Sequence, residues 1–398
     1  MIKTPRNKRP VAIAGGGIGG LACALALARR GFASMVLEQA RDFGEVGVGL
    51  QVAPNALHVL DALGVGERAK KDAFLIERMV MADAVSGEEI LNIECGEAFR
   101  KRFGNPYAVA HRADIHGALL EGCREQPLVT LRTSSRVTAY EERGDGVTAT
   151  LANGDTIDAD ALVGADGVHS VIRQRIVGDG EPLPSGAMIY RAVIPAEQMP
   201  KDLQNPYPIM WVGPGTHIIY YPVRDWKVFN FGATIVTGAD SVDETSDAPP
   251  SEALPLFEHG CDIPLRVMRI PQSFKRYLIR HREPAENWTQ GAVTLLGDAA
   301  HPMVQYIAQG AAMALEDAIC LGACVDQSDG NYADAFRQYQ AIRIVRASRV
   351  QMSSLMMDRI YHAKGVARRV RNSLFEGRTQ EEHYDRLSWL YTAPEYVR

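Results

Sequence analysis

The N-terminal part of the chain alternates short apolar runs with a helical repeat of apolar positions. Residues 11–14 form a continuous apolar run typical of a buried strand. Apolar residues then recur at helical spacing from Ile18 to Leu25, and two arginines and a glycine at 29–31 end that helix. A second apolar run follows at 34–37. The pattern predicts a strand, a helix and a parallel strand, which is a βαβ unit.

The pattern changes between residues 180 and 288. Apolar and polar positions alternate at 217–222 and again at 227–231, as expected for strands of an antiparallel sheet with one face covered. Beyond residue 332 the pattern becomes that of a long amphipathic helix, which continues to residue 358. We therefore predict an α/β protein in which a Rossmann-like domain is combined with a domain built on an antiparallel sheet, followed by C-terminal helices.

Composition and charge limit the classes of partner that we expect the protein to bind. The chain has 398 residues, a length that usually divides into two domains, with 46% hydrophobic and 23% charged residues. The net charge is only -5 and no run of Lys or Arg occurs, so we expect neither nucleic acid nor a membrane surface as partner. A small-molecule ligand is favoured.

The sequence also predicts a cytoplasmic protein without a metal site. The basic N-terminus precedes an apolar run as in a signal peptide, but five glycines at 15–20 interrupt that run. The six cysteines include no CxxC pair, and Cys320 and Cys324, one helical turn apart, have no further ligand between them. We interpret them as reduced core residues.

A glycine-rich motif, GxGxxG, connects the first strand to the helix. Gly15 permits the turn, Gly17 lets a phosphate approach the backbone, and Gly20 lets helix and strand pack closely. The second strand ends on Glu38, where a carboxylate accepts hydrogen bonds from ribose hydroxyls. The motif predicts a dinucleotide site but does not separate FAD from NAD.

Three later segments resemble the FAD-dependent aromatic hydroxylase family, of which p-hydroxybenzoate hydroxylase is a member, and the resemblance covers nearly the whole chain. They are the DG-type segment 165–173, the GD-type segment 295–302 and the segment 111–116. Taken singly, Asp166 could belong to a plain turn and Arg112 could be a helix-start residue paired with Asp114. In combination and order, the three segments favour FAD.

The resemblance implies cofactor contacts. It assigns Asp166 to FAD and nicotinamide binding, Asp298 to the ribityl or ribose hydroxyls, and Arg112 to the FAD phosphates. It places the helix that begins at Gly310 with its N-terminus towards the flavin ring, where the helix dipole stabilises an anionic reduced flavin by about 0.3–2 kcal/mol. Gln51 completes the expected cofactor contacts.

Within the family, the local sequence is most similar to that of 3-hydroxybenzoate 6-hydroxylases, at residues 43–52, 213–222 and 300–306. By position, His217, Tyr221 and Gln305 would surround the phenol and carboxylate of a bound ring. A histidine is suited to accept the phenolic proton. The alternatives are that His217 only satisfies a buried polar group and that Tyr221 is an ordinary core aromatic residue.

The activity that this resemblance implies is hydroxylation of a phenolic aromatic acid with NAD(P)H and O2, through a flavin C4a-hydroperoxide. We expect 3-hydroxybenzoate to become 2,5-dihydroxybenzoate (gentisate). A catechol-forming salicylate 1-hydroxylase, or another hydroxybenzoate or N-heteroaromatic hydroxylase, is the alternative. Two other classes remain open: an FAD dehydrogenase or reductase that does not use O2, and a flavin-binding module. NADH is expected as co-substrate, with NADPH not excluded.

The predicted domains are interleaved. The FAD-binding domain comprises 1–75, 105–180 and 288–345, the substrate-binding domain comprises 76–104 and 181–287, and residues 346–398 form a C-terminal helical segment. Because many relatives are dimers, we expect a homodimer with a contact in the C-terminal region, and the alternative is a solvated helix with a packed tail.

Overall fold

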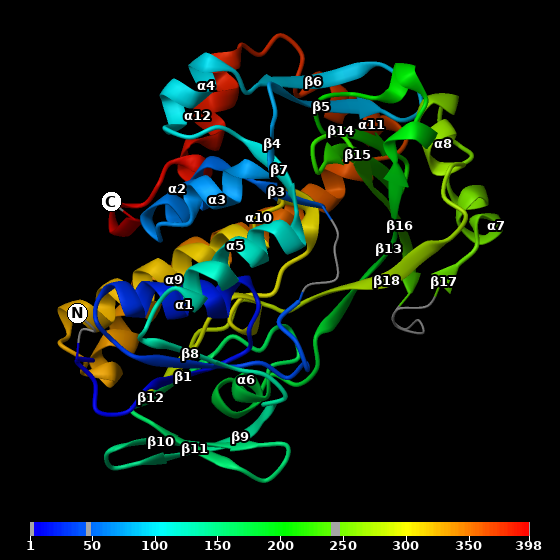
Figure 1. Ribbon diagram of the computed structural model, residues 1–398. Coiled ribbons are helices and arrows are strands. Elements are labelled where there is room, and N and C mark those ends of the chain that lie inside the picture. The colour runs from blue at the N-terminus through cyan, green and yellow to red at the C-terminus, as the bar shows by residue number, and fades with distance from the viewer. Residues whose placement is uncertain (1–3, 45–48, 240–246, 398) are drawn as a thin grey trace.

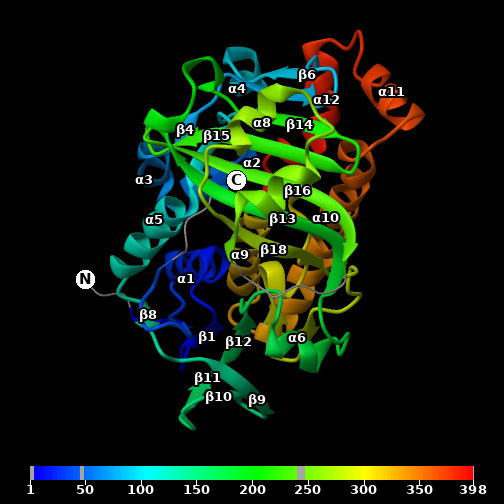
Figure 2. The same cartoon turned by 90° about the vertical axis from the view of Figure 1, so that its right-hand side faces the viewer.

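The structure is a computed structural model that describes residues 4–44, 49–239 and 247–397. A parallel sheet and a larger, mainly antiparallel sheet occupy different ends of the molecule, with helices between them and beside them (Figures 1 and 2). This is the mixed α/β architecture that the sequence pattern predicts, including the C-terminal helices.

The first sheet carries the glycine motif. Its described strands run in the order β19-β20-β12-β1-β2-β8 and are parallel except for the β19–β20 pair. The strands are β1 (Val11–Ala14), β2 (Ser34–Leu37), β8 (Val129–Arg132), β12 (Ala161–Gly164), β19 (Thr289–Gln290) and β20 (Val293–Leu295). Helices α1 (Ile18–Arg29), α5 (Arg112–Arg124) and α9 (Gly310–Gln327) lie above one face of this sheet in Figure 1. The pattern of buried residues explains the packing, because β1 is buried along its whole length and α1 from Leu21 to Ala28.

The second sheet forms the other layer. Its described strands run in the order β17-β18-β13-β16-β15-β14-β5-β6. They are β5 (Arg78–Asp83), β6 (Glu89–Glu94), β13 (Leu183–Pro195), β14 (Ile209–Gly213), β15 (Thr216–Val223), β16 (Val228–Ala239), β17 (Asp247–Ala248) and β18 (Phe274–His281). All neighbours pair antiparallel except β5 and β14, which are parallel. One face packs on a core that includes Phe229 and Phe231, and the other face turns towards the rest of the molecule.

Register decides which side chains share that second face. His217 of β15 lies opposite Thr234 of β16, and Ile219 lies opposite Gly232. Gly232 in turn pairs with Arg191 of β13. Since side chains alternate along a strand, His217, Ile219 and Tyr221 point to one face, with Arg191 in the row of Ile219.

The smaller elements connect and cover these two sheets. The described residues include two small sheets, β3 (Gly49–Val52) with β7 (Ala108–His111) and β4 (Phe74–Leu75), and β9 (Val137–Arg143) with β10 (Gly146–Leu151) and β11 (Thr156–Ala159). The shorter helices are α2 (Pro54–Ala62), α3 (Gly66–Lys71), α4 (Glu97–Phe103), α6 (Val171–Ile176), α7 (Pro250–Ala253) and α8 (Asp262–Met268). The β9–β11 sheet lies on the side of the parallel sheet away from α1 (Figure 1).

The C-terminal region is helical: α10 (Tyr332–Tyr361), α11 (Val366–Ser373) and α12 (Gln380–Tyr391). Helix α10 passes unbroken through residue 345, so the boundary that we predict there lies inside a helix. Helix α11 is tied to the second sheet, because Arg368 and Arg371 each form an ion pair with buried Asp83 at 2.7 Å. The C-terminal helices therefore contact both large sheets: α10 packs on β19 and β20, and α11 is held to β5.

Two kinds of feature are absent from the residues that the structure describes. None of the helices there is both long and apolar enough to cross a bilayer. No group of three or more His, Cys, Asp or Glu side chains there is arranged to hold a metal ion.

Candidate active site

The glycine turn leaves no room for larger residues. Gly15 has a φ of +108°, and a Cβ there would lie 2.2 Å from the Ala165 carbonyl oxygen. A Cβ on Gly20 would lie 2.0 Å from the carbonyl oxygen of Gly15. Gly17 is the N-cap of α1 and has no side chain to occupy the helix N-terminus. Backbone N–H groups at such a helix start form a binding site for phosphate.

Two elements brace this turn. Glu38, directly after β2, accepts hydrogen bonds from the backbone N–H groups of Gly16 and Ala40, both at 2.8 Å. His116 of α5 contacts the Gly16 carbonyl oxygen through Nε2 at 2.8 Å. Arg112 is the first residue of the same helix α5 and is exposed. The turn, Glu38 and the start of α5 thus form one unit.

The DG and GD segments meet beside the glycine turn. Asp166 follows the strand next to β1, and burial raises the pKa of its carboxyl. Its Oδ2 accepts from the Val171 N–H at 3.0 Å, while its buried Oδ1 has no hydrogen-bond partner among the described residues. Asp298 is exposed, and its Oδ1 lies 3.8 Å from where a Cβ of Gly310 would be. The carboxylate thus lies at the start of α9.

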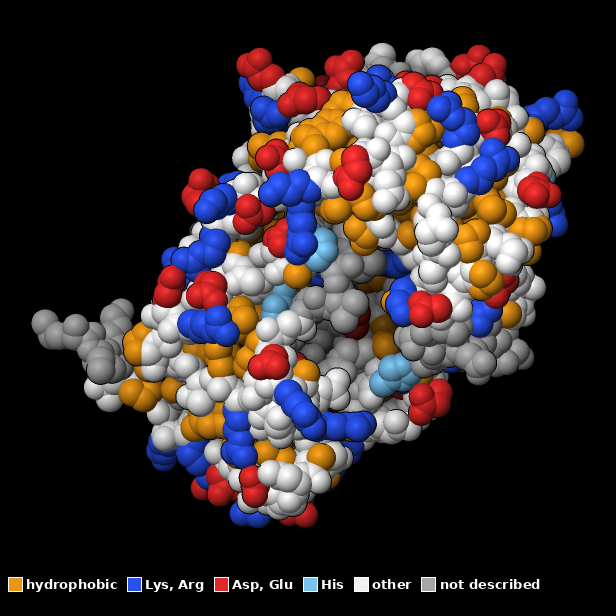
Figure 3. Space-filling view, turned by 45° about the vertical axis from the view of Figure 1, so that its right-hand side comes forward, with side chains coloured by type: hydrophobic (Ala, Val, Ile, Leu, Met, Phe, Trp, Pro, Cys, Tyr) orange, Lys and Arg blue, Asp and Glu red, His pale blue; other side chains and the backbone are white. Residues whose placement is uncertain are grey.

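A cavity of about 260 Å³ joins these segments to the second sheet. Its walls come from the DG segment, the GD segment and strand β18 and are formed by Val168, His169, Tyr277, Leu278, Arg280, Asp298, Pro302 and Met303. The space-filling view shows the corresponding face hollowed near its centre, with histidine side chains at the rim (Figure 3).

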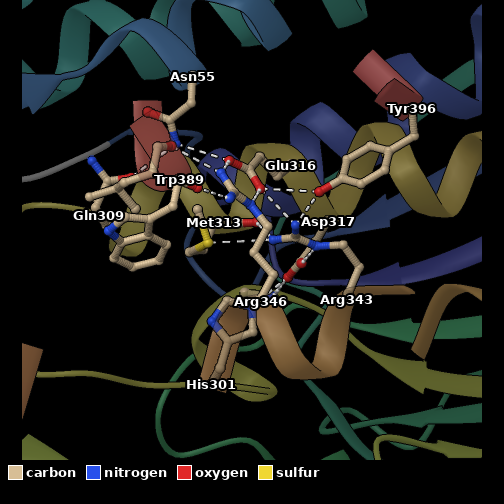
Figure 4. Close-up of polar contacts among 12 residues, drawn as sticks. Asn55, His301, Gln309, Met313, Glu316, Asp317, Arg343, Arg346, Trp389 and Tyr396 are labelled. Carbon is tan, nitrogen blue, oxygen red and sulfur yellow. Dashed lines mark hydrogen bonds and ion pairs between the residues drawn. The ribbon is translucent and has the colours of Figure 1, made fainter. Parts of the chain in front are cut away.

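Behind the GD segment lies a buried ionic network (Figure 4). Asp317 of α9 pairs with Arg343 at 2.7 Å and with His301 at 2.5 Å, and its Oδ2 accepts from the Gly297 N–H at 3.0 Å. Burial raises the pKa of Asp317, but its contacts with His301 and Arg343 outweigh that effect and hold the pKa well below its usual value. Asp317 therefore fixes both ends of the GD segment, through Gly297 and His301.

The same network reaches the N-terminus of α9. Glu316 pairs with Arg343 at 2.6 Å and with Arg346 at 2.7 Å. Asn55 of α2 donates to Glu316 and to Gln309, each at 2.9 Å. Gln309 Nε2 and Asn55 Oδ1 are buried with no hydrogen-bond partner among the described residues. Polar atoms buried in this way usually have a partner such as a ligand or water.

The second sheet presents a half-buried cation, Arg191, on its inner face. Arg191 donates to the amide oxygen of Gln305, and its neighbours include Tyr221 and Tyr277. Burial lowers the pKa of Arg191 and raises that of Tyr221. A guanidinium in this position is suited to bind a carboxylate. Sequence reasoning missed Arg191, because a single arginine in a strand pattern has no motif.

Strand β3 joins the two halves beside Tyr221. Gly49 donates from its N–H to Asn230 Oδ1 at 2.8 Å, and a Cβ on Gly49 would lie 2.7 Å from the Tyr221 ring. Gln51, further along β3, accepts a hydrogen bond from the Tyr107 hydroxyl at 2.8 Å. Residues 45–48, which belong to the sequence match at 43–52, lie outside the described residues.

His217 lies at the other end of the same sheet face. It is 4% exposed and its Nδ1 lies 2.8 Å from Nε2 of His362, the residue that follows α10. The rings of Tyr306 and Tyr361 meet it edge-on at 5.5 and 5.6 Å. Tyr306 follows Gln305 directly, and Gln305 accepts a hydrogen bond from Arg191, so the segment 305–306 connects the surroundings of His217 with those of Arg191. The contact with His362 has no sequence signal, because the two residues are far apart in the chain.

A dinucleotide with a redox-active ring fits this arrangement. The glycine turn supplies backbone N–H groups for a pyrophosphate, and Asp298 supplies an exposed carboxylate for hydroxyls. The unpartnered atoms of Gln309 and Asn55 lie at the N-terminus of α9, beyond the GD segment. A bound flavin would supply redox chemistry between this region and the sheet.

Comparisons with known proteins agree with this geometry. The family described as "FAD binding domain" matches residues 8–351. The chain is 45% identical to 3-hydroxybenzoate 6-hydroxylase from Polaromonas naphthalenivorans, covering 96% of this chain and 95% of that protein. It is also 45% identical to 3-hydroxybenzoate 6-hydroxylase from Klebsiella oxytoca, covering 95% of each.

A solved structure shares the whole fold. The crystal structure of Klebsiella pneumoniae HpxO complexed with FAD and uric acid superposes with a TM-score of 0.85 at 25% identity, covering 96% of this chain and 97% of that one. The family match and the relatives agree on one assignment. This chain belongs to the FAD-binding aromatic hydroxylase family and is a flavoprotein monooxygenase.

Proposed function

We propose that the protein hydroxylates 3-hydroxybenzoate to 2,5-dihydroxybenzoate, with NADH as the electron donor. The relatives named above support the substrate, since both are 3-hydroxybenzoate 6-hydroxylases at 45% identity. The observation that carries the proposal is one face of the second sheet, on which Arg191 and His217 lie in neighbouring rows, with Gln305 accepting a hydrogen bond from Arg191. A cation and a neutral imidazole on one face match the carboxylate and the hydroxyl of a phenolic acid.

The substrate residues have distinct roles in this proposal. Arg191 binds the carboxylate and displaces part of its contact with Gln305. His217 accepts the phenolic proton, which makes the ring electron-rich where oxygen is to be inserted. Gln305 and Tyr221 hold the ring between them. Burial on this face excludes water and strengthens each of these polar contacts.

The cofactor residues hold FAD across the parallel sheet. The N–H groups after Gly15 and Gly17 bind the pyrophosphate, Glu38 binds a ribose, and Asp298 binds hydroxyls of the chain that leads to the flavin. The remaining proposed contacts are those of Gly20, Gln51, Arg112, Asp166 and Gly310. Among the described residues only one GxGxxG turn follows a strand, so NADH binds transiently at the flavin site.

A product assay tests the proposal. Purified protein with FAD, NADH and O2 is given 3-hydroxybenzoate, 4-hydroxybenzoate and salicylate in turn, and the products are separated by chromatography. We expect gentisate from 3-hydroxybenzoate and faster NADH oxidation with that acid than with the others. Catechol from salicylate as the main product would establish the salicylate 1-hydroxylase alternative. NADH oxidation by a non-oxygen acceptor, with no hydroxylated product, would establish a dehydrogenase.

A further inference from the structure

Three side chains form an unbroken hydrogen-bonded line from the second sheet towards solvent. His217 Nδ1 lies 2.8 Å from His362 Nε2, and His362 Nδ1 lies 2.9 Å from Asp358 Oδ1. The exposed fractions of the side chains rise along the line, from a buried His217 to 5% for His362 and 41% for Asp358. The two imidazole planes differ by only 24°. The line therefore links buried His217 to solvent through the two imidazole rings and the carboxylate of Asp358.

The carboxylate sets the direction of every hydrogen bond in this line. An ionised Asp358 only accepts, so His362 carries a proton on Nδ1. A neutral His362 then has its lone pair on Nε2 and accepts from His217 Nδ1. His217 consequently keeps its lone pair on Nε2. This is the tautomer that a base needs if Nε2 faces the substrate.

The charges around the line favour these protonation states. Burial and the neighbouring His362 lower the pKa of His217 well below its usual value, so its ring is neutral at pH 7. The hydrogen bond from His362 lowers the pKa of Asp358, so the carboxyl is ionised.

The elements packed against the line add few other charges. The facing residues from η5 (Gln305–Ile307), α10, β14 and β16 are Tyr306, Tyr361, Arg359, Val212 and Thr234. Of these, only Arg359 has a full charge, and it stabilises the carboxylate of Asp358.

We propose that His362 and Asp358 are positioning residues that orient His217 and carry the phenolic proton of the substrate between His217 and solvent. The phenol O–H bond breaks and a bond from the proton to His217 Nε2 forms. The Nδ1 proton of His217 moves to His362 Nε2, and the Nδ1 proton of His362 moves to Asp358 and then to water. When the hydroxylated ring takes a proton back, the same transfers run in reverse and restore the starting tautomers.

This inference rests on the proposed function, because it needs a phenolic substrate at His217. The test uses the full-length flavoprotein and compares His217→Gln, His362→Gln, Asp358→Asn and Asp358→Glu. Asp334→Asn is the matched control, because Asp334 lies on the same helix α10 with a similarly exposed side chain, 43%. Each protein is first checked for FAD content and melting temperature. The rate of gentisate formation, its KM for 3-hydroxybenzoate and the gentisate formed per NADH oxidised are then measured between pH 7 and pH 9.5.

At pH 7 we expect His362→Gln and Asp358→Asn to form roughly tenfold to a hundredfold less gentisate per unit time, with KM within about threefold, because general base catalysis contributes about 10²–10⁴-fold. The missing electrons appear as H2O2. The defect shrinks as pH rises, because a phenol with a pKa near about 10 increasingly arrives already ionised. A ring-fluorinated, more acidic 3-hydroxybenzoate narrows it in the same way, and Asp358→Glu restores most of the activity.

The outcomes separate the relay from the activity itself. If His362→Gln and Asp358→Asn formed as much gentisate per NADH oxidised as the wild-type protein while His217→Gln was impaired, the relay would be overturned and the proposed function would stand. A defect that stays constant with pH and accompanies FAD loss in both variants would show a structural role and also overturn it. No gentisate from the wild-type protein would overturn the proposed function first.

Discussion

Arg191 is the residue whose chemistry depends most on its surroundings. It lies on the inner face of the second sheet, and burial lowers its pKa while Gln305 accepts its hydrogen bond. A half-buried cation gains more from a bound carboxylate than an exposed one does. We therefore assign to it much of the selectivity for aromatic acids over neutral phenols.

Arg191→Met tests this assignment. The variant loses a charge-assisted hydrogen bond of about 1.5–3 kcal/mol, so KM for 3-hydroxybenzoate should rise roughly tenfold to a hundredfold. Turnover of 3-methylphenol, which has no carboxylate, should change little. The comparison is Arg266→Met, because Arg266 is an exposed arginine of α8 paired with Asp202. Equal changes in KM for 3-hydroxybenzoate and 3-methylphenol would show that Arg191 does not bind the carboxylate.

At the residue scale, the sequence predicts the functional residues that belong to a local motif and misses those whose partners lie in distant segments of the chain. Gly15, Gly20 and Glu38 could be placed in advance, because turn geometry and strand ends are local properties. Arg191 and His362 could not, since each acquires its partner from a distant segment. The roles of Tyr221 and Gln51 remain predictions.

At the scale of elements, the turn between β1 and α1 is the feature least tolerant of change. A Cβ on Gly20 would overlap the Gly15 carbonyl oxygen at 2.0 Å, and that atom is backbone and cannot swing away. Gly20→Ala should therefore distort the turn, and we expect the purified variant to be colourless or nearly so. FAD content is read from the visible absorbance of the flavin relative to the ultraviolet absorbance of the protein.

A matched glycine provides the control. Gly117 lies inside α5, and a Cβ there would have no atom within 4 Å. Gly117→Ala should keep full FAD and gain up to about 1 kcal/mol of stability from helix propensity. If Gly20→Ala retained FAD as Gly117→Ala does, the pyrophosphate would have to bind elsewhere.

The ionic network between α9 and α10 ties the GD segment to the C-terminal layer. Removing one partner of a buried ion pair costs about 3–5 kcal/mol, so Asp317→Asn should lower the free energy of unfolding by that order and weaken FAD retention. Asp329→Asn, at an exposed ion pair with Arg6, should change it by no more than about 1 kcal/mol. Chemical denaturation measures both.

The network also predicts how stability depends on pH. The pKa of Asp317 is held below its usual value in the folded protein, so its contribution is complete above the unfolded pKa of about 3.9 and is lost as pH falls further. Between pH 7 and pH 3, the free energy of unfolding should therefore fall more for the wild-type protein than for Asp317→Asn. Parallel curves would show that Asp317 does not contribute to acid sensitivity.

For the elements, hydrophobic periodicity gave the right type wherever a repeat is long. The run from 332 to 358 predicts most of α10, and the alternation at 217–222 predicts β15. The parallel β5–β14 pair and the contact between α11 and Asp83 follow from topology, which no local pattern contains. The domain boundaries remain a proposal for the same reason.

At the scale of the molecule, one apolar stripe on α10 is exposed. The stripe consists of Ile342, Val345, Met352 and Met356, which are 46% to 74% exposed. Successive members lie three, seven and four positions apart, and this spacing places them along one side of the helix. Exposed apolar stripes of this kind are typical of protein interfaces. Since a two-fold axis lets one stripe pair with itself, we expect a homodimer through α10.

Light scattering of Val345→Glu combined with Met356→Glu tests this expectation. The variant should be monomeric where the wild-type protein is dimeric, because charges would be buried without partners. Leu183→Glu alters a similarly exposed apolar residue on β13, 47% exposed, and should stay dimeric. A dimer that persists in the double variant would place the contact on another surface.

We propose that a flavin held at the glycine turn delivers one oxygen atom to an aromatic acid bound on the second sheet. The most direct measurement is turnover of 3-hydroxybenzoate with NADH under ¹⁸O2, followed by mass spectrometry of the product. We expect gentisate carrying one ¹⁸O atom, formed in step with NADH oxidation. Product with oxygen from water, or NADH oxidation that yields only H2O2, would contradict it.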